Sequence, residues 1–296
     1  MCSPNQSNYT IMSITDNKTS RITMLGTGNA MCVNCYNTCF YLRSPRGGML
    51  VDGGGGNGIL QQLIAAKIPF ESINHMFVTH SHTDHIMGAI WMIRKISPMI
   101  FKGKHKGIFT IYANDVVLHA IKTMGELMIP SKIFNSLGQT IILKEVKDGE
   151  EVNIDDMKVT FFDIGSTNFK QFGFSAQLPD EQRLVCLGDE PYSMQSEPYA
   201  RNCDWLMCEA FCLYKDRFVF NPYEKNHSTA LDAGMLAQEL GVKHLVLYHT
   251  EDTHLDTRAA TYSAEASQYY KGPILVPNDL ESFDLKPDKS SDSAKN

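Results

Sequence analysis

Apolar runs separated by glycine-rich and polar turns divide the first half of the chain into short segments. Runs with turn residues on both sides predict strands, and they lie at 21–25, 38–43, 49–52, 73–79 and 108–112. Apolar residues at helical spacing predict two helices, and these fall at 59–67 and 86–96. We expect Ser97-Pro98 to end the second helix, because a residue before proline disfavours helical backbone.

The second half repeats this style. Further strands are predicted near 157–163, 172–178, 183–187, 204–209 and 244–249, with a last short pair between 273 and 285. A helix is predicted over Thr229–Leu240, where Gly241 is placed as a C-cap. Because strands lie on both sides of helices along the chain, the pattern predicts an α/β (α+β) fold with two sheets covered by helices.

Composition and charge narrow the class of protein. The chain has 296 residues, 43% hydrophobic and 20% charged, which supports a sizeable core and excludes global disorder. Its net charge is 27 − 33 = −6, which argues against general nucleic-acid binding, since that affinity comes from clustered positive charge. No stretch reaches 18 consecutive apolar residues, so we expect no membrane span.

The ends of the chain differ from its middle. Residues 1–18 are rich in Ser, Asn and Thr and predict a flexible arm, and residues 286–296 predict a disordered tail. Between them no linker or repeat occurs, so 19–285 is predicted to be one domain. The N-terminus lacks the pattern of a signal peptide and the eight Cys read as reduced thiols, which favours a cytoplasmic location.

The segment Thr79–His85 (THSHTDH) carries the strongest chemical signal. Four potential metal ligands occupy six residues where an apolar strand stops and a helix begins. Alternation along an extended segment aims His80 and His82 the same way, and the turn into the helix brings Asp84 and His85 nearby. Imidazole and carboxylate suit zinc, with manganese or iron as alternatives, so one loop can feed two divalent ions.

Two later residues follow apolar strands in a matching way. Asp189 ends LVCLGDE and His249 ends HLVLYHT. A carboxylate at a strand tip beside a glycine is a natural bridging ligand. Taken singly, Asp189 could be a turn residue and His249 a core histidine; together with the histidine loop, both are predicted to be ligands.

These motifs resemble those of the metallo-β-lactamase superfamily, and within it the ribonuclease Z branch. The matching segments run in order from about residue 22 to 250: MLGTGNA, LVDGGG, FVTHSHTDHIMGAI, CLGDE, NHSTALDAGMLAQEL and HLVLYHT. The resemblance implies a four-layer αββα sandwich with a metal site at one edge between the sheets. It also implies a homodimer, since dimers are common in these families.

The resemblance implies a role for each site residue. One ion would be held by His80, His82 and a third histidine, and the other by Asp84, His85 and His249, with Asp189 as the bridge. Asp84 would orient or deprotonate a metal-activated water. His227 matches a histidine that contacts the scissile phosphate or protonates the leaving group.

The chain departs from the family pattern at two places. Residues 163–174 contain no histidine, so Ser166, Thr167 or Asn168 is predicted at the third-histidine position, with water or Asp163 as a substitute ligand and a weaker ion site there. The long substrate-gripping arm is also missing. The nearest basic stretch, 94–106, is either a solvated loop or a local phosphate contact.

Three functions stay open. The preferred one is a ribonuclease Z-like phosphodiesterase that acts on a small-molecule or nucleotide substrate rather than on extended nucleic acid. The same ligands would also serve a lactone, thioester or other carboxylic ester hydrolase, and the lost histidine allows a catalytically silent metal- or ligand-binding homologue.

Other motifs are assigned structural roles. The run DGGGGNG lacks the spacing of a phosphate loop, and Asp52 within it is predicted to be a hydrogen-bond acceptor beneath the metal loop. Cys32, Cys35 and Cys39 lack a fourth cysteine nearby and are predicted to be small buried thiols rather than metal ligands. Glu209 either lines the site or is structural.

Overall fold

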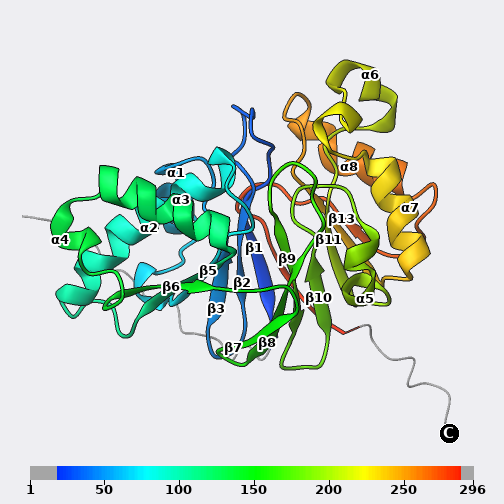
Figure 1. The fold of residues 1–296 in the computed structure, drawn as a ribbon. Helices are drawn as coiled ribbons and strands as arrows, with labels where there is room; N and C mark the ends of the chain where they lie inside the picture. Colours follow the sequence, from blue (N-terminus) through cyan, green and yellow to red (C-terminus); the bar gives the residue numbers. More distant parts are fainter. Residues whose placement is uncertain (1–18, 288–296) are drawn as a thin grey trace, which may run out of the picture.

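Two β-sheets lie face to face at the centre of the protein, and helices cover their outer faces (Figure 1). The computed structural model describes residues 19–287, so the predicted arm at 1–18 and all but the first two residues of the predicted tail at 286–296 lie outside the described residues. The first sheet has seven strands in the order β14 (Ser282–Asp284), β1 (Arg21–Gly26), β2 (Cys39–Arg43), β3 (Gly48–Val51), β4 (His75–Phe77), β5 (Phe109–Ala113) and β6 (Ile141–Glu145).

The second sheet also has seven strands, and four of them run parallel to one another. Its order is β13 (Ile274–Leu275), β12 (His244–Tyr248), β11 (Trp205–Glu209), β10 (Arg183–Cys186), β9 (Phe172–Gln177), β8 (Met157–Asp163) and β7 (Glu150–Ile154). Strands β10, β11, β12 and β13 are the parallel ones, so their carboxyl ends point to the same edge of the sheet.

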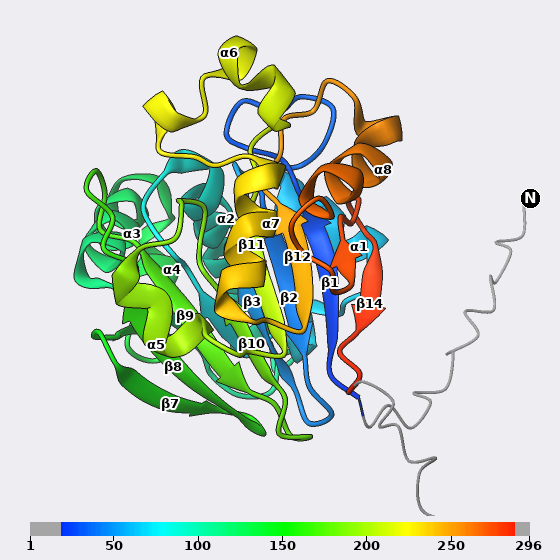
Figure 2. The ribbon, with the colours of Figure 1, turned by 90° about the vertical axis from the view of Figure 1, so that its right-hand side faces the viewer.

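Helices form the two outer layers, and Figure 2 shows α7 and α8 over the second sheet with α6 above its edge. The first sheet is covered by α1 (Gly58–Ala65), α2 (Thr83–Phe101), α3 (Asp115–Met128) and α4 (Ser131–Phe134). The second half contributes α5 (Glu197–Ala200), α6 (Arg217–Phe220), α7 (Ala230–Leu240) and α8 (Leu255–Ala266). Short 3₁₀ turns occupy Phe70–Ser72, Met194–Ser196, Tyr214–Asp216 and Tyr223–Lys225.

The core follows from alternation along the strands. On β2, Phe40 and Leu42 belong to the cluster between the sheets, whereas Tyr41 packs under the helices. On β11, Met207 faces the same central cluster, whereas Leu206 faces the outer helices. Side chains of a strand alternate between its two faces, so each buried strand serves two apolar layers. The predicted four-layer αββα arrangement of an α/β (α+β) fold is confirmed.

Most predicted elements are present, but the prediction of where one helix ends is wrong. Helix α2 does not stop at Ser97-Pro98; it continues to Phe101 with Pro98 inside it. Proline removes one backbone donor, and near a helix end the neighbouring turns retain their bonds, as Lys102 N–H still donates to the Pro98 carbonyl at 3.2 Å. Helices α3 and α8, the short helices α4, α5 and α6, and the strands β6 and β7 were not predicted.

The course of α2 also fixes the distance between the basic stretch at 94–106 and the histidine loop. It begins eleven residues after Thr83, where the helix starts, and therefore about 16 Å farther along the helix axis. Within it, His105 is buried and its Nε2 lies 3.1 Å from the Ile73 carbonyl oxygen. The stretch lies at the far end of α2 from the histidine loop, so the alternative of a phosphate contact near the site is wrong.

The thiols divide into two groups. Cys39 lies on β2 and is buried in the core, as predicted. Cys32 and Cys35 lie in the loop before this strand and are only partly buried, so the prediction of buried thiols is wrong for both. The loop passes over the edge of the sheets instead of entering the core.

Within residues 19–287, no helix is long and apolar enough to cross a bilayer.

Candidate metal centre

The carboxyl ends of several strands bring the predicted ligands to one edge of the two sheets. The histidine loop follows β4, Asp189 follows β10, and His249 follows β12. The two sheets are joined at this edge, because Phe172 N–H at the start of β9 donates to the Thr79 carbonyl at 3.0 Å. Residues more than 160 positions apart in sequence therefore share one small volume.

Asp189 lies at the focus of three imidazole rings. Its Oδ2 is 3.4 Å from His80 Nε2, 3.2 Å from His85 Nε2 and 3.5 Å from His249 Nε2. The Asp84 carboxylate lies 3.2 Å from His85 Nε2. One carboxylate oxygen among three inward-facing nitrogens is the arrangement expected of a bridging ligand.

The donors form two overlapping sets that share Asp189. In each set, the donor atoms lie within 4.8 Å of one another: the first is Asp84, His85, Asp189 and His249, and the second is His80, His82 and Asp189. Apart from His82, all of these side chains are buried. The structure thus brings together the six residues predicted as ligands, in the division that the resemblance implied.

An unpaired buried nitrogen indicates that the first set fits a cation. His85 Nε2 is buried, and in the described part of the chain it makes no hydrogen bond with good geometry, although two carboxylates lie near it. A buried polar atom without a partner is costly. Neutral nitrogen and anionic oxygen donors around it suit a divalent metal ion.

A second layer of residues fixes the orientation of each ring. His85 Nδ1 lies 2.7 Å from the Asp52 carboxylate, which also accepts from the Thr79 backbone N–H at 2.8 Å. His249 Nδ1 lies 3.0 Å from Thr38 Oγ1. Pairing of Nδ1 in this way directs Nε2 toward the cluster. Asp52 therefore has the role predicted for it, as an acceptor beneath the metal loop.

Two of these residues have strained backbones. Asp52 has a φ of 57° and His249 a φ of 59°, in the left-handed region that side chains other than glycine rarely adopt. Such conformations cluster where the chain must place a functional group. At both positions, the strained turn comes immediately after a strand and carries the side chain into the centre.

Burial and charge prepare three of the donors, His80, His249 and Asp189, to bind a cation. Burial lowers the pKa of His80 and of His249 to about 3 each, so both rings are neutral at physiological pH. Burial alone would raise the pKa of Asp189, but His80 and His85 beside it hold that pKa well below its ordinary value. Neutral imidazole and ionised carboxylate are the forms that bind metals.

Gln171 lies beside His80 and Asp189, within the stretch 163–174 in which a third histidine was sought. Its side chain is buried, its Nε2 lies 3.1 Å from His80 Nδ1, and it also donates to Asp189 Oδ1. The prediction of Ser166, Thr167 or Asn168 at this place is wrong: Thr167 and Asn168 are exposed, because the loop turns outward before β9, and Ser166 Oγ donates to Glu190 at 2.8 Å. Asp163, the predicted substitute, accepts from the Gly165 N–H at 2.8 Å.

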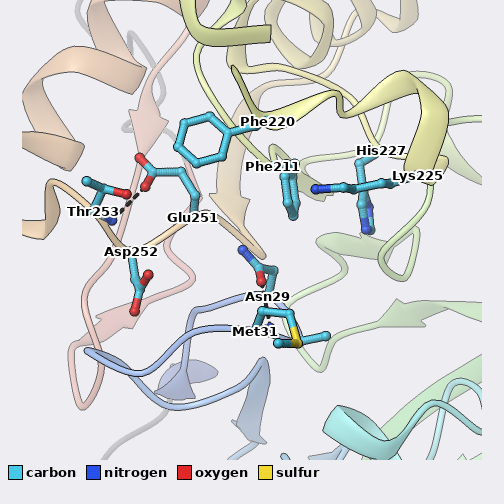
Figure 3. Close-up of a pocket in the computed structure, with 10 residues that line it drawn as sticks. Asn29, Met31, Phe211, Phe220, Lys225, His227, Glu251, Asp252 and Thr253 are labelled. Carbon is cyan, nitrogen blue, oxygen red and sulfur yellow. Dashed lines mark hydrogen bonds between the residues drawn. The ribbon is translucent and has the colours of Figure 1, made fainter. Parts of the chain in front are cut away.

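A pocket of about 290 Å³ adjoins the cluster at His227 (Figure 3). The His227 ring stacks on Phe211, with centroids 4.8 Å apart, and lies 5.1 Å from the ring of His249. Lys225 Nζ lies 5.1 Å from the centroid of the Phe211 ring. The pocket is lined by Asn29, Ala30, Met31, Phe211, Phe220, Lys225, His227, Glu251, Asp252 and Thr253.

Glu209 lies next to His227, on the side that faces the protein interior. It is fully buried, its Oε1 accepts from the Ser228 N–H at 2.6 Å, and its Oε2 is 3.7 Å from His227 Nδ1. The sequence left open whether Glu209 lines the site or is structural. In the structure, it is buried and contacts His227, a residue of the site. Phe211, Lys225 and Gln171 were missed by sequence reasoning, since none belongs to a ligand motif.

Comparison with known proteins decides the family. The family model described as anti-Pycsar protein Apyc1 matches residues 20–266. The chain belongs to the Apyc1 family. It is also 31% identical over 322 residues to ribonuclease Z of Methanothermobacter thermautotrophicus, which covers 92% of this chain and 99% of that protein.

Solved structures share the fold of this Apyc1 family member. YhfI of Bacillus subtilis, a metallo-β-lactamase fold protein, has a TM-score of 0.72 at 18% identity and covers 90% of this chain and 99% of its own. The short form of human tRNase Z (ELAC1) has a TM-score of 0.69 at 19% identity and covers 90% of this chain and 100% of its own.

The resemblance to the ribonuclease Z branch of the metallo-β-lactamase fold is therefore confirmed. The chain is an enzyme of the metal-dependent hydrolase class. Its buried His and Asp residues fit a divalent metal.

Proposed function

We propose that this enzyme hydrolyses small phosphodiesters of nucleotide size. The observation that carries the proposal is the adjacency of two features: three imidazoles focused on Asp189, and an aromatic, lysine-bearing pocket that begins at His227. The Asp/His centre would carry out the hydrolysis, and the pocket would bind the nucleoside ring and the phosphate of the substrate.

Two overlapping sets of donors support a centre with two ion sites. Asp84, His85 and His249 would hold one ion, His80 and His82 the other, and Asp189 would bridge them. Bound divalent ions, which we expect to be zinc, would activate water and neutralise phosphate charge.

The residues around the ions have distinct tasks in the hydrolysis. Asp84 accepts a proton from the attacking water and orients it, while the new P–O bond forms and the ester P–O bond breaks. His227 faces the departing oxygen and supplies its proton. Phe211 and Lys225 position the nucleoside ring and the phosphate, since base stacking on an aromatic ring and a nearby cation are general features of nucleotide binding.

The size and charge of the pocket limit the substrate. A volume of about 290 Å³ is near the lower end for ligand pockets and accommodates about one nucleotide. Glu251 and Asp252 line its far side, where they would repel a continuing phosphate backbone. A diester contained within one nucleotide, such as a cyclic mononucleotide, therefore fits better than an extended RNA.

Substrate panels test the proposal directly. We expect turnover of bis-p-nitrophenyl phosphate and of at least one 3′,5′-cyclic mononucleotide, and slow or no cleavage of a precursor transfer RNA, lactones or thioesters. Activity confined to the lactones and thioesters would overturn the phosphodiester assignment. An inactive protein with its full metal content would indicate the silent homologue.

Two variants separate the proposed roles. At matched metal content, Asp84→Ala should lower turnover of every diester by about 10²–10⁴-fold. His227→Ala should lower turnover of cyclic mononucleotides by about 100-fold but leave bis-p-nitrophenyl phosphate nearly unchanged, because nitrophenolate leaves without a proton donor. Equal losses with both substrates would remove His227 from the proton-donor role.

We also propose that the enzyme is a cytoplasmic homodimer. The cysteines within the described ranges are all free thiols, which suits a reducing compartment. Phe218 and Val219 on α6 are 78% and 75% exposed and offer an apolar surface for a second copy. Light scattering should give twice the chain mass, and a monomer at micromolar concentration would contradict the dimer.

A further inference from the structure

The loop between β1 and β2 is fastened to the segment that follows His249. Asn29 N–H donates to the Thr250 carbonyl at 3.0 Å, and Thr250 N–H donates to the Thr27 carbonyl at 3.1 Å. Farther along, the N–H groups of Val33 and Asn34 donate to Asp252 Oδ2 at 2.7 and 2.6 Å. The Asp252 carboxylate thus lies inside the turn that Cys32 and Cys35 delimit.

Cys32, Cys35 and Asp252 form a donor cluster separate from the Asp/His centre. One donor atom from each lies within 4.8 Å of the others. Both Sγ atoms lie 2.5 Å from the position that a side chain on Gly28 would take, so glycine at this position leaves room for them. Cys32 Sγ also points to the Thr250 carbonyl oxygen at 3.3 Å.

The composition of this cluster has a definite chemical preference. Two cysteines separated by two residues are a common half of zinc sites, and a carboxylate is an accepted further zinc ligand. Soft thiolates favour zinc over magnesium or calcium. Partial exposure of both thiols gives an ion access from solvent, which core thiols such as Cys39 lack.

We propose that Cys32, Cys35 and Asp252 bind a zinc-class divalent ion, with solvent in the fourth position. The ion would cross-link the loop before β2 to the segment after His249. Because Met31 and Asp252 also line the pocket, the ion would stabilise one pocket wall without touching the Asp/His centre. The proposal does not rest on the substrate assignment.

Cobalt substitution distinguishes this site from the catalytic one. The Asp/His centre offers only nitrogen and oxygen donors, so a thiolate-to-cobalt charge-transfer band in the near ultraviolet reports on the cysteine site alone. We expect the band in the full chain loaded with Co²⁺ and in Asp189→Ala. Cys32→Ser and Cys35→Ser should lose the band and one zinc per chain by elemental analysis, whereas the control Cys39→Ala should keep both.

Two further variants distinguish loss of the ion from misfolding of the protein. Cys35→His should retain the extra ion, because imidazole replaces the lost thiolate as a ligand, and its band should be weaker, because only one thiolate remains. Asp252→Ala should weaken cobalt binding while both thiols stay present. Absence of the band in folded wild-type protein would overturn the proposal. So would a Cys32–Cys35 disulfide in protein purified under reducing conditions, because a disulfide leaves no thiolate for the ion.

Discussion

The two halves of the Asp/His centre share Asp189 but are built differently. The Asp84 half (Asp84, His85 and His249) is buried. The His80 half (His80, His82 and Gln171) includes a ring that is partly exposed, and His82 contacts Phe169, which is itself 48% exposed. The first half is preorganised by packing, whereas the second borders solvent.

The donors of the halves differ as well. Beside Asp189, the Asp84 half offers a carboxylate and two imidazoles, but in the His80 half an amide stands beside two imidazoles. The Gln171 amide uses its N–H to bond Asp189, and its Oε1 is buried with no hydrogen-bond partner among residues 19–287. A neutral amide oxygen is a weaker zinc donor than imidazole. We therefore expect tight binding in the Asp84 half and weaker binding in the His80 half.

Removal of one histidine from each half should show the difference in zinc affinity between the halves most strongly. We expect His249→Ala to lower the tighter zinc affinity more than about 100-fold, since even indirect ligand supports are worth 10–100-fold. His82→Ala should leave that tighter affinity nearly unchanged and affect only the weaker ion. Zinc titration against a competing chelator measures both, and equal losses would show that the halves are not distinct.

The sequence was informative where chemistry is concentrated in motifs. The histidine loop, Asp189 and His249 all follow apolar strand runs, so their positions at strand ends could be predicted. Gln171 could not, because a single glutamine before a strand carries no ligand signal and its role depends on how the preceding loop turns outward.

Elements with weak patterns were also missed. Helix α8 is polar along much of its length, with Arg258 and Tyr262 among its few buried residues, so apolar periodicity did not reveal it. Helix α3 begins at an N-cap that could have marked it, since Asn114 accepts from the Val117 N–H.

Restoring a histidine should remove much of the difference between the halves. Gln171→His would replace the amide beside His80 with an imidazole, and we expect about 10–100-fold tighter binding of the weaker zinc ion. The matched variant Gln171→Glu tests whether charge alone suffices. If the histidine variant binds the second ion no better, the amide is not what weakens this half.

A change in the supporting residues should have a smaller effect on the Asp84 half. Thr38→Val removes the partner of His249 Nδ1 and keeps the shape of the side chain. We expect zinc affinity there to fall by about 10-fold or more. Thr23→Val, on an exposed hydrogen bond with Ser282, serves as the control and should change nothing.

The pocket provides the smallest expected effect and lies outside both halves. Phe211→Leu should raise KM for a cyclic mononucleotide by about 10-fold, because base stacking on an aromatic ring is worth roughly 1–3 kcal/mol. Zinc affinity in both halves should stay unchanged. A parallel loss of metal would mean that Phe211 supports the centre instead of the substrate.

Anomalous diffraction at the zinc edge tests the central claim most directly, on crystals of protein purified without added metal. The account predicts a strong peak among Asp84, His85, Asp189 and His249, and a weaker peak beside His80 and His82. Two peaks of equal, full occupancy would contradict the difference between the halves, and no peak near Asp189 would contradict the metal centre itself.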